Sequence, residues 1–71
     1  MNERVRLGNR IKYLRNKKKI SRGELSLLST VNYTTLMNIE NGRTNPKLDT
    51  LWRLAKFLEV NLKEFFNDGE K

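Results

Sequence analysis

The stretch from residue 21 to residue 42 constrains the fold most, because it holds start and stop signals for two short helices. Ser21 and Glu24 form a capping box, in which the hydroxyl and the carboxylate each accept a hydrogen bond from an otherwise unpaired backbone N–H. Asn32 is a preferred N-cap for a second helix. Gly42 is a typical residue just past a helix end. The stretch therefore predicts two short helices joined by a tight turn.

The two predicted helices cover about residues 22–29 and 33–41, and a link this short makes them cross at a steep angle. Their apolar residues recur with helical spacing and should face inward. These residues, with one from the turn, are Leu25, Leu28, Val31, Leu36 and Ile39. The outer side of the second helix keeps Tyr33, Thr34, Met37 and Asn38. A helix that buries one face and presents hydrogen-bonding side chains beside a basic surface is typical of a DNA-reading helix.

Positive charge is concentrated at the N-terminal end of the 71-residue chain, whose net charge is +7. Residues 1–22 hold nine Lys or Arg and one acidic residue, a balance of +8. Residues 23–71 hold six basic and seven acidic residues, a balance of −1. One end of the chain is therefore expected to attract polyanions such as nucleic acid. A solvated face that only aids solubility is the alternative for a basic run taken alone.

The composition argues against several function classes. The chain has no histidine and no cysteine, and no carboxylate pair or glycine-rich phosphate loop stands out, so we expect no enzyme, metal site or cofactor. No apolar run approaches the roughly 20 residues that span a bilayer, and no signal-peptide pattern opens the chain. A cytoplasmic protein with no membrane contact and no small-molecule effector site is the expectation.

Three further helices are predicted around this central pair. The first covers about residues 3–16, the fourth residues 48–58, and a last short helix residues 61–67. The apolar residues expected to face inward from the first and fourth helices are Leu7, Ile11, Leu14, Leu48, Leu51, Leu54, Ala55 and Leu58. Asn61 and Glu64 form a cap-like pair for the last helix. The fold class is therefore all-α, with five helices in one domain over 1–71, a core over 4–67 and a disordered tail over 68–71.

From Leu7 to Phe66 the chain resembles the lambda-repressor-like helix-turn-helix domains of phage repressors, Cro proteins and small bacterial regulators. The resemblance rests on RIKYLRNKKKIS at 10–21, ENGRTNP at 40–46 and the helix LDTLWRLAKFLEVNLKEFF that begins at 48. It implies a sequence-specific transcriptional regulator, a repressor, that binds a pseudo-palindromic operator in double-stranded DNA as a homodimer. The alternative is a protein-interaction module that keeps the fold without specific DNA binding.

The resemblance also implies roles for particular residues, with the helix over 33–41 in the major groove. The expected base-reading residues are Tyr33, Thr34, Met37 and Asn38. The expected phosphate-contacting residues are Arg10, Ser21, Arg22, Asn41, Arg43, Thr44 and Lys47. Arg15 and Glu40 are expected to form an ion pair that ties the reading helix to the scaffold. The expected dimer interface consists of Trp52, Phe57, Val60 and Phe66.

Two positions depart from the family pattern. Thr30 stands where the family usually has a glycine with positive φ, and a β-branched residue is unfavourable there. We therefore expect the turn to take a different local shape. Leu27 stands where polar residues are common, and it should point outward from its helix.

Overall fold

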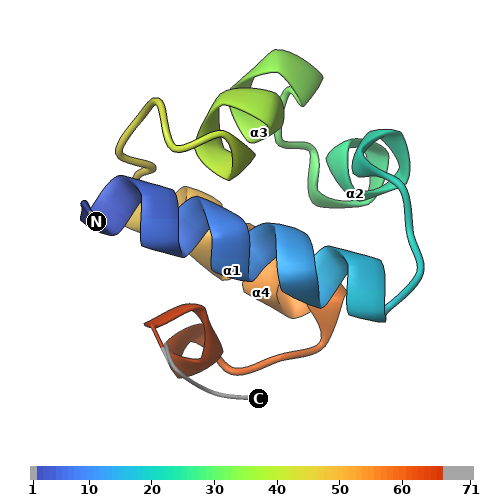
Figure 1. Cartoon of the computed structure of the whole chain (residues 1–71). Coiled ribbons are helices and arrows are strands. Elements are labelled where there is room, and N and C mark those ends of the chain that lie inside the picture. The colour runs from blue at the N-terminus through green and yellow to red at the C-terminus, as the bar shows by residue number, and fades with distance from the viewer. Residues whose placement is uncertain (1, 67–71) are drawn as a thin grey trace.

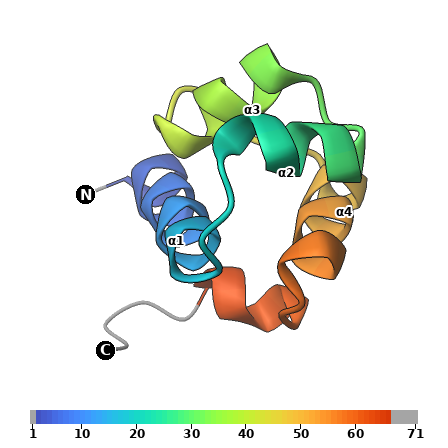
Figure 2. The same cartoon turned by 90° about the vertical axis from the view of Figure 1, so that its right-hand side faces the viewer.

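The computed structural model describes residues 2–66; the predicted disordered tail over 68–71 lies outside the described part of the chain. The described residues form α1 (Glu3–Lys17), α2 (Arg22–Ser29), α3 (Tyr33–Glu40), α4 (Leu48–Leu58) and the 3-10 helix η1 (Leu62–Phe66). Figures 1 and 2 show α2 and α3 on one side of the pair formed by α1 and α4, and η1 on the other side. The helix-turn-helix unit and η1 therefore lie on opposite faces of the molecule.

The all-helical class is confirmed, but the prediction of five α-helices was wrong by one. The last element is a 3-10 helix of five residues, in which the Glu64 amide donates to the Asn61 carbonyl at 2.9 Å. Hydrogen bonds of this i to i+3 type define 3-10 helices, which occur as short segments and seldom as long ones. The Glu64 carboxylate, which was expected to support a cap, instead accepts from Arg10 of α1. Tertiary contact with α1 thus replaces the predicted cap interaction.

The cap signals of the central pair form as predicted. The Ser21 hydroxyl accepts from the Glu24 amide at 3.0 Å, and the Glu24 carboxylate accepts from the Ser21 amide at 2.8 Å. The Asn32 side-chain oxygen accepts from the amide of Thr34 at 2.8 Å. Gly42, with φ 73°, ends α3 in the left-handed region. Local sequence signals therefore place both ends of α3.

The core lies between the four α-helices and η1. Its buried apolar members are Ile11, Leu14, Leu25, Val31, Leu36, Ile39, Leu51, Leu54, Ala55, Leu58 and Phe65. Leu28 and Leu48 were predicted to be inward, and this was wrong, because they are 51% and 62% exposed. Leu28 lies in the last turn of α2, next to the point where the chain leaves the helix. Leu48 is the first residue of α4, so no preceding helical turn covers it.

The turn between α2 and α3 keeps a left-handed residue despite its side chain. Thr30 has φ 60° and ψ 18°, so the expectation of a different local shape was wrong. A left-handed conformation costs a non-glycine residue about 1 to 2 kcal/mol. Hydrogen bonds on both sides hold the turn, because the buried Ser29 hydroxyl donates to the Leu25 carbonyl at 2.7 Å and accepts from the Val31 amide at 3.2 Å.

Gly8 allows α1 and α3 to approach closely. A Cβ atom at this position would lie 2.3 Å from the carbonyl oxygen of Ile39 and 2.7 Å from that of Glu40. Both neighbours are backbone atoms of the last turn of α3, and they cannot move aside without shifting the helix. The missing side chain of Gly8 therefore sets the distance between α1 and the end of α3.

Candidate nucleic-acid interface

The four predicted base-reading residues lie on one side of α3. Tyr33 and Thr34 belong to its first turn and are exposed, whereas Met37 and Asn38 follow one turn later and are half-buried. Residues four apart on a helix are neighbours on its surface, so each member of the first pair lies beside one of the second. The inner side of α3 is buried through Leu36 and Ile39. The helix therefore buries one face in the core and presents the other.

A buried carboxylate stands at the end of this helix. The Glu40 side chain is 0% exposed and accepts from Arg15 Nε at 2.7 Å and from Arg15 Nη2 at 3.0 Å. This confirms the geometry of the expected pair between α1 and α3. Two parallel N–H donors on one carboxylate fix both its position and its orientation. The last turn of α3 is therefore tied to α1 both by this pair and by the close backbone contact at Gly8.

A second arginine reaches the same carboxylate, and sequence analysis missed it. Arg22 Nε donates to Glu40 Oε1 at 3.0 Å. Burial by itself would lower the pKa of Arg22, but the hydrogen bonds that it donates to Glu40 and Tyr33, and the charge of these groups, outweigh burial and raise the pKa. No local signal relates Arg22 to Glu40, because the two residues meet only through the crossing of α2 and α3. Arg15, Glu40 and Arg22, here called the Glu40 cluster, join three helices.

The other predicted phosphate contacts flank the helix-turn-helix unit. Ser21 and Arg22 open α2, and the remaining residues lie in the loop after α3. In that loop Asn41, Arg43 and Lys47 are exposed and Thr44 is half-buried. The Arg43 amide donates to the Asn38 carbonyl at 2.9 Å, which anchors the start of the loop to α3. Both ends of the unit thus carry donors on accessible positions.

In the structure Arg10 lies apart from this set, because η1 engages its guanidinium. Its Nε donates to the Glu64 carbonyl at 2.7 Å, and its Nη2 lies 3.3 Å from the Glu64 carboxylate. Glu64 belongs to η1, on the face opposite α2 and α3 (Figures 1 and 2). Helical periodicity placed Arg10 away from the apolar side of α1. It could not indicate which other side of α1 would be covered by η1.

Folding pairs part of the positive charge of the basic N-terminal region with carboxylates of the same chain. Of the nine Lys and Arg within residues 1–22, four form ion pairs inside the described chain. They are Arg10, Arg15, Lys18 and Arg22. Their carboxylate partners all lie beyond residue 22, so folding brings the separated charges of the sequence together. The charge that faces solvent is therefore smaller and more evenly spread than the sequence alone implies.

The predicted dimer residues differ in their exposure. Trp52 and Phe66 are 63% and 58% exposed, whereas Phe57 and Val60 are partly buried against the core. Trp52 and Phe57 are five residues apart on α4, which places them on different sides of the helix. Leu48, one turn before Trp52, is also exposed. The outward apolar surface of α4 therefore runs along Leu48 and Trp52.

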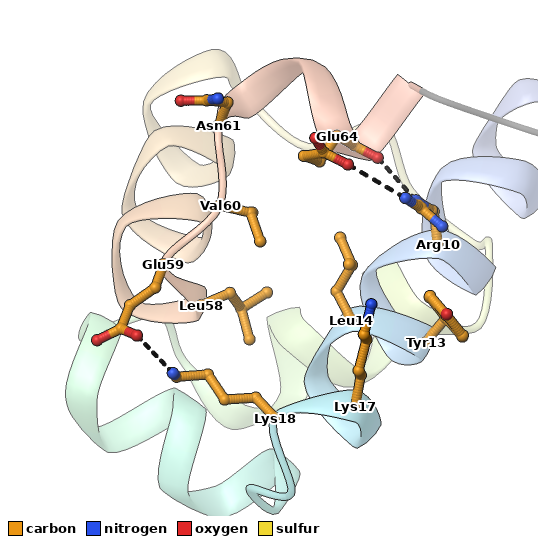
Figure 3. Close-up of a pocket in the computed structure, with 10 residues that line it drawn as sticks. All are labelled: Arg10, Tyr13, Leu14, Lys17, Lys18, Leu58, Glu59, Val60, Asn61 and Glu64. Carbon is orange, nitrogen blue, oxygen red and sulfur yellow. Dashed lines mark hydrogen bonds and ion pairs between the residues drawn. The ribbon is translucent and has the colours of Figure 1, made fainter. Parts of the chain in front are cut away.

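A polar groove lies between the C-terminal half of α1 and the link from α4 to η1. Figure 3 shows Leu14, Leu58 and Val60 pointing toward its floor, with two ion pairs along its rim. One is the Arg10 pair, and in the other Lys18 Nζ lies 2.7 Å from the carboxylate of Glu59. These pairs join α1 to the C-terminal end of the described chain and do not converge on a common point.

Residues 2–66 contain no group of three or more side chains of the metal-ligating types that could hold an ion together. None of the helices in this range combines the length and the apolar character required for crossing a membrane.

Comparison with known proteins gives consistent matches. The family model described as helix-turn-helix matches residues 11–65. The control protein C.MunI of a Mycoplasma species is 34% identical over 69 residues, which cover 96% of this chain and 93% of that protein. The transcriptional regulator PuuR of Escherichia coli is 30% identical over 64 residues. Those residues cover 90% of this chain, but this chain spans only 35% of the length of PuuR.

Solved structures agree with the sequence matches. The restriction-modification controller protein C.AhdI of Aeromonas hydrophila superimposes with a TM-score of 0.88 at 30% identity, over 90% of this chain and 97% of that one. A helix-turn-helix transcriptional regulator of Vibrio cholerae superimposes with a TM-score of 0.84 at 32% identity, over 89% of this chain and 35% of that one.

Proposed function

Because this chain belongs to the helix-turn-helix family of DNA-binding transcriptional regulators, we propose that it is a repressor that recognises a pseudo-palindromic operator as a homodimer. In this proposal α3 lies in the major groove and reads base edges from its N-terminal half. The observation that carries the proposal is the exposed hydrogen-bonding side of α3 above the buried Glu40 cluster. A reading helix held in this way presents its side chains with little freedom to shift.

The side chains on α3 suit the major groove. Asn38 can pair with adenine through N6 and N7, and Thr34 can donate, accept or touch a thymine methyl group. The phenol of Tyr33 can reach a base or a phosphate. Met37, which is half-buried, can add an apolar contact to a thymine methyl group. These four residues would supply the sequence information, since only contacts to base edges distinguish one sequence from another.

The flanking residues would set the register of the protein on DNA. The first backbone N–H groups of an α-helix have no partner within the helix, and those of α2 lie beside Arg22. A helix N-terminus of this kind favours an anion such as phosphate. Arg43, Thr44 and Lys47 would contact the backbone on the other side of the unit. The terminal nitrogens of Arg22 can still approach a phosphate while its Nε holds Glu40. Such contacts raise affinity for any duplex and make it depend on salt.

The dimer surface that we propose is centred on Trp52 and Phe66, with Leu48 added and with Phe57 and Val60 in a supporting role. Its support is the exposure of three large apolar side chains on α4 and η1, which soluble proteins more often show at interaction sites than elsewhere. Trp52→Ala should weaken self-association in sedimentation equilibrium. A wild-type protein that sediments as a monomer at high micromolar concentration would refute the dimer.

The biological setting is proposed from the extent of the similarity. The matches to C.MunI and C.AhdI run over nearly the whole of those two proteins. We therefore place this chain with control proteins of that type, acting on a promoter of a restriction-modification system. A transcriptional reporter that carries the selected operator over its promoter should lose expression when the protein is supplied. A rise in expression would replace repression with activation.

The test of sequence-specific binding is a selection of bound sequences from random duplex DNA, followed by titration of the selected site at several salt concentrations. We expect a palindromic consensus and a steep fall of affinity with salt. Asn38→Ala should reduce discrimination at one base position by about tenfold. Binding that is weak and indifferent to sequence would contradict the proposal and favour a protein-interaction module with the same fold.

A further inference from the structure

Arg22 connects the two ends of the reading helix. Its Nε is bonded to the carboxylate of Glu40, the last residue of α3. Its Cζ lies 5.9 Å from the ring centroid of Tyr33, the first residue of the same helix. Tyr33 and Glu40 are seven residues apart, about two helical turns, so both lie toward the same side of α3. One side chain of α2 thus touches α3 near both of its termini.

The anchor of Arg22 is rigid. Glu40 is fully buried and is held by two bonds from Arg15, so the oxygen that receives Arg22 Nε has a fixed position. A guanidinium is planar, and it can donate from its edge while its face meets an aromatic ring. Arg22 therefore has one preferred placement for its plane. That plane becomes a fixed surface beside Tyr33.

Tyr33 needs such a surface. It opens α3, so no earlier turn of the helix packs against its ring, and the ring is exposed. An exposed aromatic side chain without a neighbour samples several rotamers. The contact with Arg22 is of the cation–π kind, within the roughly 6 Å over which such attraction operates. It favours one orientation of the Tyr33 ring over the others.

We propose that Arg22 is a positioning residue for base recognition, which orients Tyr33 from an anchor on Glu40. The inference rests on the proposed function, because it assigns a source of specificity within the same reading surface. It differs from a phosphate contact in its consequence. A phosphate contact strengthens binding to every sequence, whereas a residue that orients Tyr33 changes the preference for the base that Tyr33 reads.

The variant that separates these roles is Arg22→Lys. Lysine keeps the positive charge near Glu40 and can still reach a phosphate, but it has no planar group to face the Tyr33 ring. We expect a two- to fivefold loss of discrimination, by an order-of-magnitude estimate, at the operator position that Tyr33 reads. Affinity for unrelated duplex DNA and the dependence on salt should stay at their wild-type values.

The decisive measurement is a double-mutant cycle on the selected operator and its single-base variants. In a Tyr33→Ala background, Arg22→Lys should cause no further loss of discrimination, because the residue to be positioned is gone. An equal loss with and without Tyr33 would overturn the assignment. A uniform loss across all sequences, with a smaller salt slope, would also overturn it and make Arg22 a phosphate contact.

A matched control and a measurement without DNA complete the test. Arg53→Lys changes an exposed arginine of α4 whose nearest carboxylate, Asp49, is 3.9 Å away, and it should leave discrimination unchanged. In the free protein, NMR should show contacts between the Arg22 side chain and the Tyr33 ring, and their absence would contradict the proposal. A wild-type protein without any sequence preference would refute the proposed function itself, whatever the NMR contacts show.

Discussion

Two regions of this small protein use the same kind of interaction in different surroundings. At the C-terminal end of α3, here called the reading end after the proposed function, the fully buried carboxylate of Glu40 binds two arginines. At the link from α4 to η1, Glu59 pairs with Lys18, and the Glu59 side chain is 74% exposed. The distances are alike, at 2.7 Å for the shortest bond of each. Burial therefore decides how much an ion pair contributes to stability. Water screens the exposed pair, whereas a buried charge that loses its partner has no water to replace it.

The buried cluster and the more exposed ion pairs also differ in their roles. The Glu40 cluster joins α1, α2 and α3 at the place where α3 ends, so in the proposed function it would fix the geometry with which α3 meets DNA. The pairs of Lys18 with Glu59 and of Arg10 with Glu64 hold the α4 to η1 segment against α1. Every buried side-chain nitrogen and oxygen within residues 2–66 has a hydrogen-bond partner. The buried charge is thus fully satisfied, and its removal should have the largest effect.

Glu40→Ala is expected to have the largest effect on the free energy of unfolding. It leaves the buried Arg15 and the half-buried Arg22 without their shared acceptor, which should lower the free energy of unfolding by about 3 to 5 kcal/mol in urea denaturation. A small domain has about 5 to 15 kcal/mol in total, so Glu40→Gln serves as the milder variant if the first does not fold. Glu59→Ala is the matched control and should leave the urea midpoint nearly unchanged. Equal effects at the two positions would contradict the role assigned to burial.

Gly8→Ala tests the reading end without changing a charge. The added methyl group would meet the carbonyl oxygens of Ile39 and Glu40 at distances far below van der Waals contact. We expect a loss of about 1 to 3 kcal/mol in the free energy of unfolding, the range typical of overpacking. The control is Gly23→Ala in α2, where the nearest atom lies 3.8 Å away. That substitution should be neutral or stabilising by about 0.5 to 1 kcal/mol, and a loss there like that at Gly8 would refute the steric argument.

Arg10→Met tests how much the ion pair between α1 and η1 contributes to stability. Methionine keeps an unbranched apolar stem but removes both hydrogen bonds to Glu64. The free energy of unfolding should fall by about 1 to 2 kcal/mol, because the pair is only partly shielded from water. Affinity for duplex DNA and its salt slope should stay unchanged in titrations. A salt slope reduced by about one would restore Arg10 to the phosphate contacts.

The smallest expected effect is the titration of Glu59. The hydrogen bond from Lys18 and its charge lower the pKa of this carboxyl below its ordinary value. A lowered pKa in the folded state stabilises the fold above the unfolded pKa of about 4.3, and this contribution is lost as pH falls through the folded pKa. In NMR titration, Lys18→Met should move the midpoint of Glu59 upward. An unchanged midpoint would show that the pair does not persist in solution.

Much of the fold follows from local sequence signals. The four α-helices begin and end within about one residue of their predicted bounds, because caps and helical spacing act over a few residues. The reading side of α3 follows for the same reason, since burial of Leu36 and Ile39 turns Tyr33, Thr34 and Asn38 outward. The ion pair of Arg15 and Glu40 came from the family resemblance, and the structure contains it.

Other features were decided only when helices distant in sequence met. The crossing of α2 and α3 brings Arg22 to Glu40, and the packing of η1 on α1 brings Arg10 to Glu64. The contact of α1 with α3 makes Gly8 indispensable, and the ends of α2 and α4 leave Leu28 and Leu48 uncovered. The sequence determined where each helix lies and which side of α3 is polar. The tertiary structure decided which charges are buried together, because that depends on crossing angles and distances between helices that local hydrogen bonds do not specify.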